Sequence, residues 1–215
     1  MAVFSFLARL LLSTLLWPLA ACLAWALFHQ GAHLPWGQAP LLLFAGGFAA
    51  YLLVQMLFWK PLFMYVMGHE LTHALAAVLQ GGKADDLHVS TQGGQVKVDR
   101  NNFLVNLAPY CFPIYTVGVA AVYAVAAEPF KPALVFGLGF TLAFHVALTL
   151  YSMRQHQSDI SEVGWYFALP FIGCVNALIA ALVLALVSPA MGMRAYSAET
   201  WAAAKGMAGW VAARM

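Results

Sequence analysis

One long uncharged run constrains the fold of this chain more than any other feature. No Asp, Glu, Lys or Arg occurs between Leu10 and Trp59. A helix that crosses a bilayer needs about 20 apolar residues, so this run is long enough to cross a membrane twice. Of the 215 residues, 63% are hydrophobic and 8% are charged, about a third of the charged fraction of an ordinary soluble domain. The sequence therefore predicts an integral membrane protein.

Apolar segments of a suitable length for bilayer-crossing helices recur along the whole chain. We expect six of them, at residues 7–28, 40–59, 61–80, 103–127, 132–153 and 163–188. Only Lys60-Pro61 separates the second segment from the third, so residues 40–59 form either a complete crossing or a re-entrant segment. The predicted fold is an all-α polytopic membrane protein with a single domain over residues 1–215. We expect it to be a multi-pass protein of a membrane such as the bacterial inner membrane.

Two segments outside these spans have patterns of their own. Within the polar insert 81–102, residues 87–91 and 95–98 alternate apolar and polar side chains on either side of Gln92-Gly93-Gly94. This alternation around glycines predicts a short β-hairpin. Residues 197–215 place most of their large apolar side chains on one helical face, which predicts a helix that lies in the membrane interface.

Charge and cysteine content exclude several other classes of function. The net charge is +2 and the basic residues are scattered, so the chain lacks the continuous basic patch that nucleic acid binding needs. We therefore expect the lipid bilayer, and no nucleic acid, as a partner. Cys22, Cys111 and Cys174 lie in apolar segments at unrelated spacings, which predicts buried free thiols. The sequence leaves the oligomeric state and the membrane orientation open.

The segment from Gly68 to Gly82 places the pattern HExxH in an otherwise apolar stretch, as His69, Glu70 and His73. Residues four apart lie on one face of a helix, so both imidazoles can reach one ion while Glu70 stands beside a water held there. The pattern is typical of zinc proteases, in which the glutamate takes the proton of the water and delivers it to the leaving amine.

A packing role for these polar side chains is the simpler alternative. Chance would produce HExxH in only about a few per thousand chains of this composition. Polar groups inside a membrane span are also costly unless they are satisfied, and Zn²⁺ would satisfy both imidazoles. The sequence therefore predicts a zinc site with His69 and His73 as ligands.

Several motifs together resemble the site-2-protease class of intramembrane zinc metalloproteases. They are GHELTHAL in an apolar span, the Gly-Gly pair that follows it, the hairpin-like insert and Asn106-Leu107-Ala108-Pro109. The resemblance covers mainly residues 61–115 and extends to 140–165. It implies cleavage of a membrane-spanning protein substrate within or near the bilayer. Asn106 is then a candidate for binding substrate, although a helix-packing role is an equal alternative.

The chain departs from this class at the third zinc ligand. The class usually has Asp-Gly closely after its NxxP segment, and that aspartate binds the zinc, whereas no acid follows Pro109 here. Asp159, at the start of the sixth span, and His145, inside the fifth, are the candidates to replace it. His145 lies about 13 Å below the nearer end of its span at 1.5 Å per residue, close to the expected depth of His73. Depth thus favours His145, while the resemblance favours an aspartate.

We predict Asp159 as the third ligand, with His145 as a hydrogen-bond donor to the transition state or as the alternative ligand. Val96 and Val98, on the second strand of the hairpin, are predicted to bind the main chain of the substrate, because an exposed strand edge offers free hydrogen-bonding groups. The expected partner is thus a membrane protein substrate.

The predicted function is that of a zinc-dependent endopeptidase acting on membrane-spanning or membrane-associated proteins. One alternative is a non-catalytic membrane protein with a structural or regulatory metal site. Glu70 argues against this alternative, because a structural site needs ligands but no general base. Another alternative is a zinc protease of a different membrane lineage that cuts segments at the membrane surface. The chain has no sizeable soluble catalytic segment, which argues against that lineage.

Overall fold

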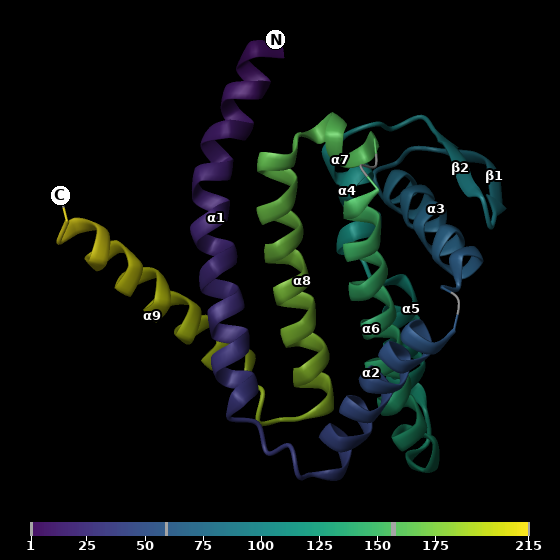
Figure 1. Cartoon of the computed structure of the whole chain (residues 1–215), viewed down its shortest axis with the longest axis vertical. Helices are drawn as coiled ribbons and strands as arrows, with labels where there is room; N and C mark the ends of the chain where they lie inside the picture. Colours follow the sequence, from purple (N-terminus) through teal and green to yellow (C-terminus); the bar gives the residue numbers. More distant parts are fainter. Residues whose placement is uncertain (1, 59, 156–157, 215) are drawn as a thin grey trace. The chain divides into compact units, whose positions relative to one another are not determined.

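The computed structural model describes residues 2–58, 60–155 and 158–214, and it is mainly helical (Figure 1). The elements in order are α1 (Ala2–Ala32), α2 (Ala39–Leu57), α3 (Leu62–Leu79), β1 (Ala84–Ser90), β2 (Gly93–Val98), α4 (Phe103–Cys111), α5 (Ile114–Val125), η1 (Glu128–Phe130), α6 (Lys131–Arg154), α7 (Ser158–Val163), α8 (Trp165–Val187) and α9 (Met193–Ala212). Residues 42–163 form one compact unit, and residues 1–41 with 164–215 form a second. The single domain expected over residues 1–215 stays a prediction.

Among the described residues, five helices are long and apolar enough to cross a membrane. They are α1 from Arg9 onward, α2, α3, α6 together with η1, and α8. This confirms a helical fold of the membrane type. Helix α2 runs unbroken for 19 residues, a length that suits a complete crossing better than a re-entrant segment. Trp59, the last residue of the span expected there, lies outside the described residues.

The span expected at residues 103–127 is not one helix. Helices α4 and α5 are bent by 66° at Phe112 and Pro113, so the described residues contain five candidate spans, or six if the bent pair counts as one. Pro113 disfavours helical geometry in the residue before it, and Phe112 is extended, with φ −105° and ψ 105°. Pro109 lies inside α4 without ending it, so the break depends on the second proline. Because of the bend, α4 runs in a different direction from α5, and it packs against α3.

The predicted hairpin is confirmed, but its turn lies elsewhere. Strands β1 and β2 pair antiparallel with Ser90 opposite Gly93, so the turn consists of Thr91 and Gln92. The two glycines assigned to the turn belong to β2. Gly94 lies so close to α3 that a Cβ atom there would come within 2.7 Å of Glu70 Cγ. The glycine therefore serves the close approach of strand to helix, which a turn prediction based on Gly-Gly misses.

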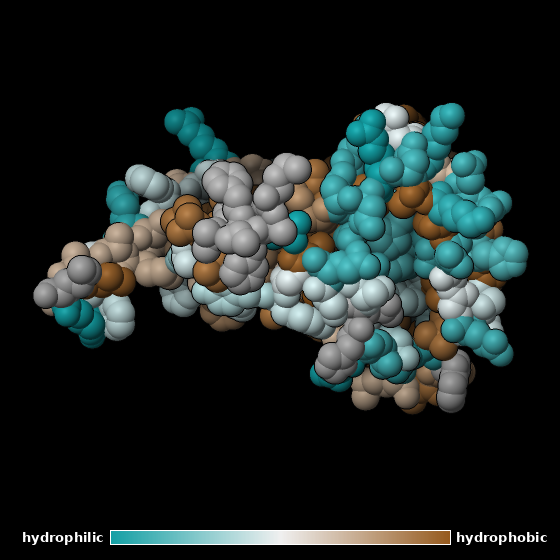
Figure 2. All heavy atoms as spheres, turned by 90° about the horizontal axis from the view of Figure 1, so that it is seen from above, coloured by the Kyte–Doolittle hydropathy of each residue, from teal (hydrophilic) through white to brown (hydrophobic). Residues whose placement is uncertain are grey.

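The hairpin lies against α3 within the unit 42–163 (Figure 1). Viewed from the end of this unit that carries the hairpin and α7, hydrophilic side chains dominate its surface (Figure 2). The long sides of its candidate spans expose apolar side chains instead, including Leu71 and Val78 on α3. The polar end and the apolar sides of this unit agree with a membrane protein that has one wetted end.

The other unit consists of α1, α8 and α9, with α1 and α8 packed side by side (Figure 1). Tyr196 of α9 is buried and donates a hydrogen bond to the carbonyl oxygen of Leu23 on α1, at 3.0 Å. Helix α9 begins at Met193, four residues before the predicted start, and exposes Trp201 and Trp210. Its interfacial position stays a prediction, and Met215 lies outside the described residues.

The three cysteines are buried and free, as predicted from their apolar surroundings. Cys22 lies on α1 and Cys174 on α8, while Cys111 ends α4 in the other unit. None of them belongs to the cluster of potential metal ligands found among the described residues.

Candidate metal centre

Helix α3 carries the HExxH pattern on a continuous helix, as the sequence predicts. His69 and His73 lie one turn apart, and Tyr65 precedes them by another turn on the same face. The Nε2 atoms of the two histidines are 3.2 Å apart. Both rings therefore point their Nε2 atoms at a common position.

The other nitrogen of each ring has a partner that fixes the ring. His73 Nδ1 lies 2.9 Å from the carbonyl oxygen of Val105 on α4 and, as a donor, leaves Nε2 free to bind a metal. Asn102 caps α4 by accepting hydrogen bonds from the N–H groups of Leu104 and Val105, which fixes this end of the helix. The cap thus helps to position the carbonyl group that orients His73.

Tyr65 orients the ring of His69. Its hydroxyl oxygen lies 3.3 Å from His69 Nδ1 and also forms a hydrogen bond with Ser152, which is fully buried on α6. His69 is thereby tied to a neighbouring helix as well as to its own. Both rings are held in the orientation that a metal site needs.

Asp159 completes a cluster with the two histidines. It lies in the first turn of α7, and its Oδ2 is 3.3 Å from His69 Nε2 and 3.5 Å from His73 Nε2. Bonds of about 2.0–2.1 Å to a tetrahedral zinc would place any two ligand atoms about 3.3–3.4 Å apart. The three measured separations, 3.2, 3.3 and 3.5 Å, match one face of such a tetrahedron. The cluster could therefore hold one metal ion at a site of tetrahedral dimensions.

The charge state of Asp159 also suits a ligand. Burial opposes ionisation of this carboxyl group, but its contacts with His69 and His73 outweigh burial and hold the pKa of Asp159 below its ordinary value. The group is therefore ionised, which is the form that binds a metal.

A polar cavity of about 310 Å³ adjoins the cluster. The lining residues are His69, Glu70, His73, Gly94, Gln95, Val96, Val98, Asn101, Val105, Asn106, Ser158, Asp159 and Glu162. The structure therefore brings together Glu70, Asn106, Val96 and Val98, which the sequence proposed from separate motifs. Asn106 donates a hydrogen bond to Glu162 from its Nδ2 at 3.1 Å.

Glu70 is held beside the ligands by the hairpin. The backbone N–H of Val96 on β2 faces its carboxylate, and Gly94 lets the strand come this close. The carboxylate therefore lines the same cavity as the metal ligands, within reach of a water placed there.

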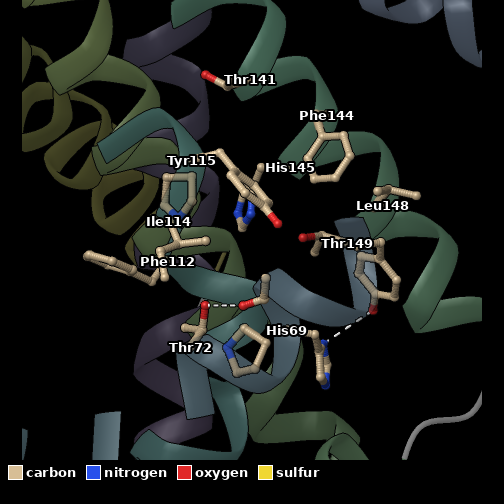
Figure 3. A pocket seen from close by; sticks show the side chains of 14 residues that line it. His69, Thr72, Phe112, Ile114, Tyr115, Thr141, Phe144, His145, Leu148 and Thr149 are labelled. Atoms are coloured by element: carbon tan, nitrogen blue, oxygen red, sulfur yellow. Dashed lines mark hydrogen bonds between the residues drawn. The ribbon is translucent and has the colours of Figure 1, made fainter. Parts of the chain in front are cut away.

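His145 lies outside this cluster, in a second and smaller cavity. That cavity, of about 30 Å³, is also lined by His69, Thr72, Tyr115 and Thr149 (Figure 3). His69 is the one residue common to the walls of both cavities. Asp159 thus belongs to the cluster that could hold a metal ion, and His145 does not. The assignment of the third ligand and the role of His145 at the transition state stay predictions.

Three residues at this site, Tyr65, Tyr110 and Glu162, were not predicted from the sequence. Tyr65 precedes His69 by one turn of a predicted helix, so the helical period could have found it. Glu162 follows Asp159 by three residues and could have been found in the same way. Tyr110 could not have been found from the helical period, because its contact with Asp159 depends on the bend between α4 and α5.

Comparison of the chain with models of protein families, with curated proteins and with solved structures found no match. Inferences about function therefore rest on the residues and the geometry of the site itself.

Proposed function

We propose that this chain is a zinc-dependent endopeptidase of the site-2-protease type that cuts membrane-spanning or membrane-associated proteins. One observation carries the proposal. The ligand atoms of His69, His73 and Asp159 form a triangle of tetrahedral dimensions, and Glu70 lies beside it in a shared cavity. A purely structural site would need the triangle but would leave Glu70 without a function.

The residues at this site can carry out the separate steps of peptide hydrolysis. Bound zinc would supply Lewis acidity, which lowers the pKa of a coordinated water and polarises the scissile carbonyl. Glu70 accepts the proton that the water loses as its oxygen bonds to the carbonyl carbon. Glu70 then delivers that proton to the amide nitrogen as the C–N bond breaks, which returns Glu70 to its ionised form. The Val96 N–H keeps the carboxylate turned toward the cavity.

The edge of β2 that faces away from β1 is suited to hold an unwound substrate. The N–H of Asp99, just after β2, points toward the side of β1 and donates to the carbonyl oxygen of Lys83, just before β1, at 3.2 Å. Because backbone groups alternate along a strand, the N–H groups of Val96 and Val98 point the other way, and the Val96 contact with Glu70 agrees with this. A helical substrate hides its scissile carbonyl in its own hydrogen bonds, and a strand edge offers replacement bonds when it unwinds.

The bent pair α4 and α5 fits a broken sixth span. Together the two helices cover residues 103–125 with one interruption at Phe112 and Pro113. Irregular backbone at membrane depth is tolerated where it is buried in protein, and Pro113 is fully buried. We infer that the chain crosses the membrane six times, which places both termini on one side.

Proline at Val98 tests the proposed function through the strand edge. Val98→Pro should lower the cleavage of a transmembrane reporter in liposomes by about fivefold, since one main-chain hydrogen bond contributes about 1 kcal/mol. Zinc content should stay at the wild-type level. Val96→Pro should cost more, because it also removes the N–H that orients Glu70.

The matched control is Val98→Ala, which keeps the N–H and should cleave close to the wild-type rate. Wild-type protein that loads with zinc but never cuts a transmembrane or membrane-associated reporter would refute the proposed function. If both proline variants cleave at the wild-type rate, the edge of β2 does not bind substrate.

A further inference from the structure

Tyr110 touches two of the three candidate ligands without facing either cavity beside them. It lies near the end of α4 with only 1% of its surface exposed. Its hydroxyl donates a hydrogen bond to Asp159 Oδ2 at 3.2 Å, and its ring lies edge-on to His69 with centroids 5.4 Å apart. Because Tyr110 is not in the wall of either cavity, it would meet the ligands and not the substrate.

We propose that Tyr110 is the positioning residue for Asp159 in the metal site. The inference rests on the metal site of the proposed function and is independent of proteolysis. A carboxylate can bind a metal through either oxygen or through both, and Asp159 stands on a helix of only six residues. The Tyr110 hydroxyl contacts Oδ2, the oxygen that also faces both histidines. It therefore selects the oxygen that ligates and holds it at one corner of the triangle.

The position of Tyr110 in the chain supports this role. Where the resemblance leads one to expect an acid soon after the proline of NxxP, Tyr110 follows Pro109 directly. The bend at Pro113 gives α4 its direction, and α4 packs against α7, which carries Asp159. In this chain, therefore, α7 supplies the carboxylate and α4 supplies the hydroxyl that orients it.

The experiment measures metal binding by Tyr110→Phe in the full-length protein, purified in detergent. Phenylalanine keeps the ring against His69 and removes only the hydroxyl. Loss of such an outer hydrogen bond typically lowers metal affinity by about 10- to 100-fold, so the Kd for zinc should rise by that factor in competition with a chelating dye. The visible absorption of the Co²⁺-loaded variant should also differ from that of the wild type, because the ligand geometry relaxes.

Tyr196→Phe is the matched control. Tyr196 is equally buried and also loses one hydrogen bond, to Leu23, but it lies in the other unit of the chain. Its Kd for zinc and its Co²⁺ absorption should equal those of the wild type. A double variant separates positioning from general damage: once Asp159→Ala has removed the carboxylate, Tyr110→Phe should cause no further loss of affinity.

Each result has one meaning for the inference. Wild-type affinity and an unchanged Co²⁺ spectrum in Tyr110→Phe would overturn it, and so would additive losses in the double variant. Failure of Tyr110→Phe to fold while Tyr196→Phe folds would also overturn it, since Tyr110 would then serve packing. If wild-type protein itself binds no zinc, the proposed function fails as well, which distinguishes the two cases.

Discussion

Glu70→Gln is expected to abolish proteolysis while zinc stays bound. Glutamine has the size of glutamate and can keep its place beside Val96, but it cannot accept a proton from the attacking water. Loss of a general base at a hydrolytic site lowers the rate by on the order of a hundredfold or more. The measurement is the rate of cleavage of a transmembrane reporter in liposomes, with zinc per chain determined by elemental analysis of the same samples.

Glu128→Gln serves as the control for this change. Glu128 is exposed at the start of the η1 turn and pairs with Lys131, away from the site. This variant should cleave at the wild-type rate. Cleavage at the wild-type rate by Glu70→Gln would contradict the proposed mechanism, because some other group would then have to move the proton.

Asp159→Ala is expected to lose zinc and activity together. Two imidazoles are too few for a catalytic zinc, which normally has three protein ligands and one open position. The carboxylate also lowers the net charge of the site from +2 to +1, which eases burial of the ion. Loss of a direct ligand should cost more than the 10- to 100-fold typical of an outer contact, so we expect zinc affinity to fall by more than about a hundredfold. Equilibrium dialysis against buffered zinc measures this loss.

His145→Ala is the informative partner of that variant. His145 lines the smaller cavity and lies outside the ligand cluster, so its removal should leave most of the zinc in place. If it is the predicted donor to the transition state, activity should nevertheless fall. Loss of zinc in His145→Ala with full retention in Asp159→Ala would reverse the assignment of the third ligand.

Local sequence patterns predicted the parts of this site that depend on local structure. Apolar segments of bilayer length give α1, α2, α3, α6 and α8, because burial in lipid requires helices with satisfied backbones. The four-residue spacing of His69 and His73 is a property of a single helix, so their meeting follows from the period alone. Alternation of apolar and polar residues likewise predicted the hairpin, although not its turn.

The remaining features depend on contacts between distant segments. His69 and Asp159 are 90 residues apart in sequence, and their contact requires α3 and α7 to meet. Pro109 and Pro113 look alike in the sequence, yet only Pro113 ends a helix, and that break sets the direction of α4. The contact of Tyr110 with Asp159 depends on this bend. Gly94 is predicted as a turn residue from the sequence, and only the close packing of β2 on α3 explains the glycine there.

The most direct test of the central claim is the zinc content of the purified wild-type protein beside His69→Ala. Both proteins are dialysed against the same buffered zinc solution, and the metal is measured by elemental analysis with helicity checked by circular dichroism. The account predicts about one zinc per wild-type chain and little in His69→Ala at unchanged helicity, because only two ligands remain. A wild-type protein without zinc, or equal zinc in both proteins, would contradict a metal centre at His69, His73 and Asp159.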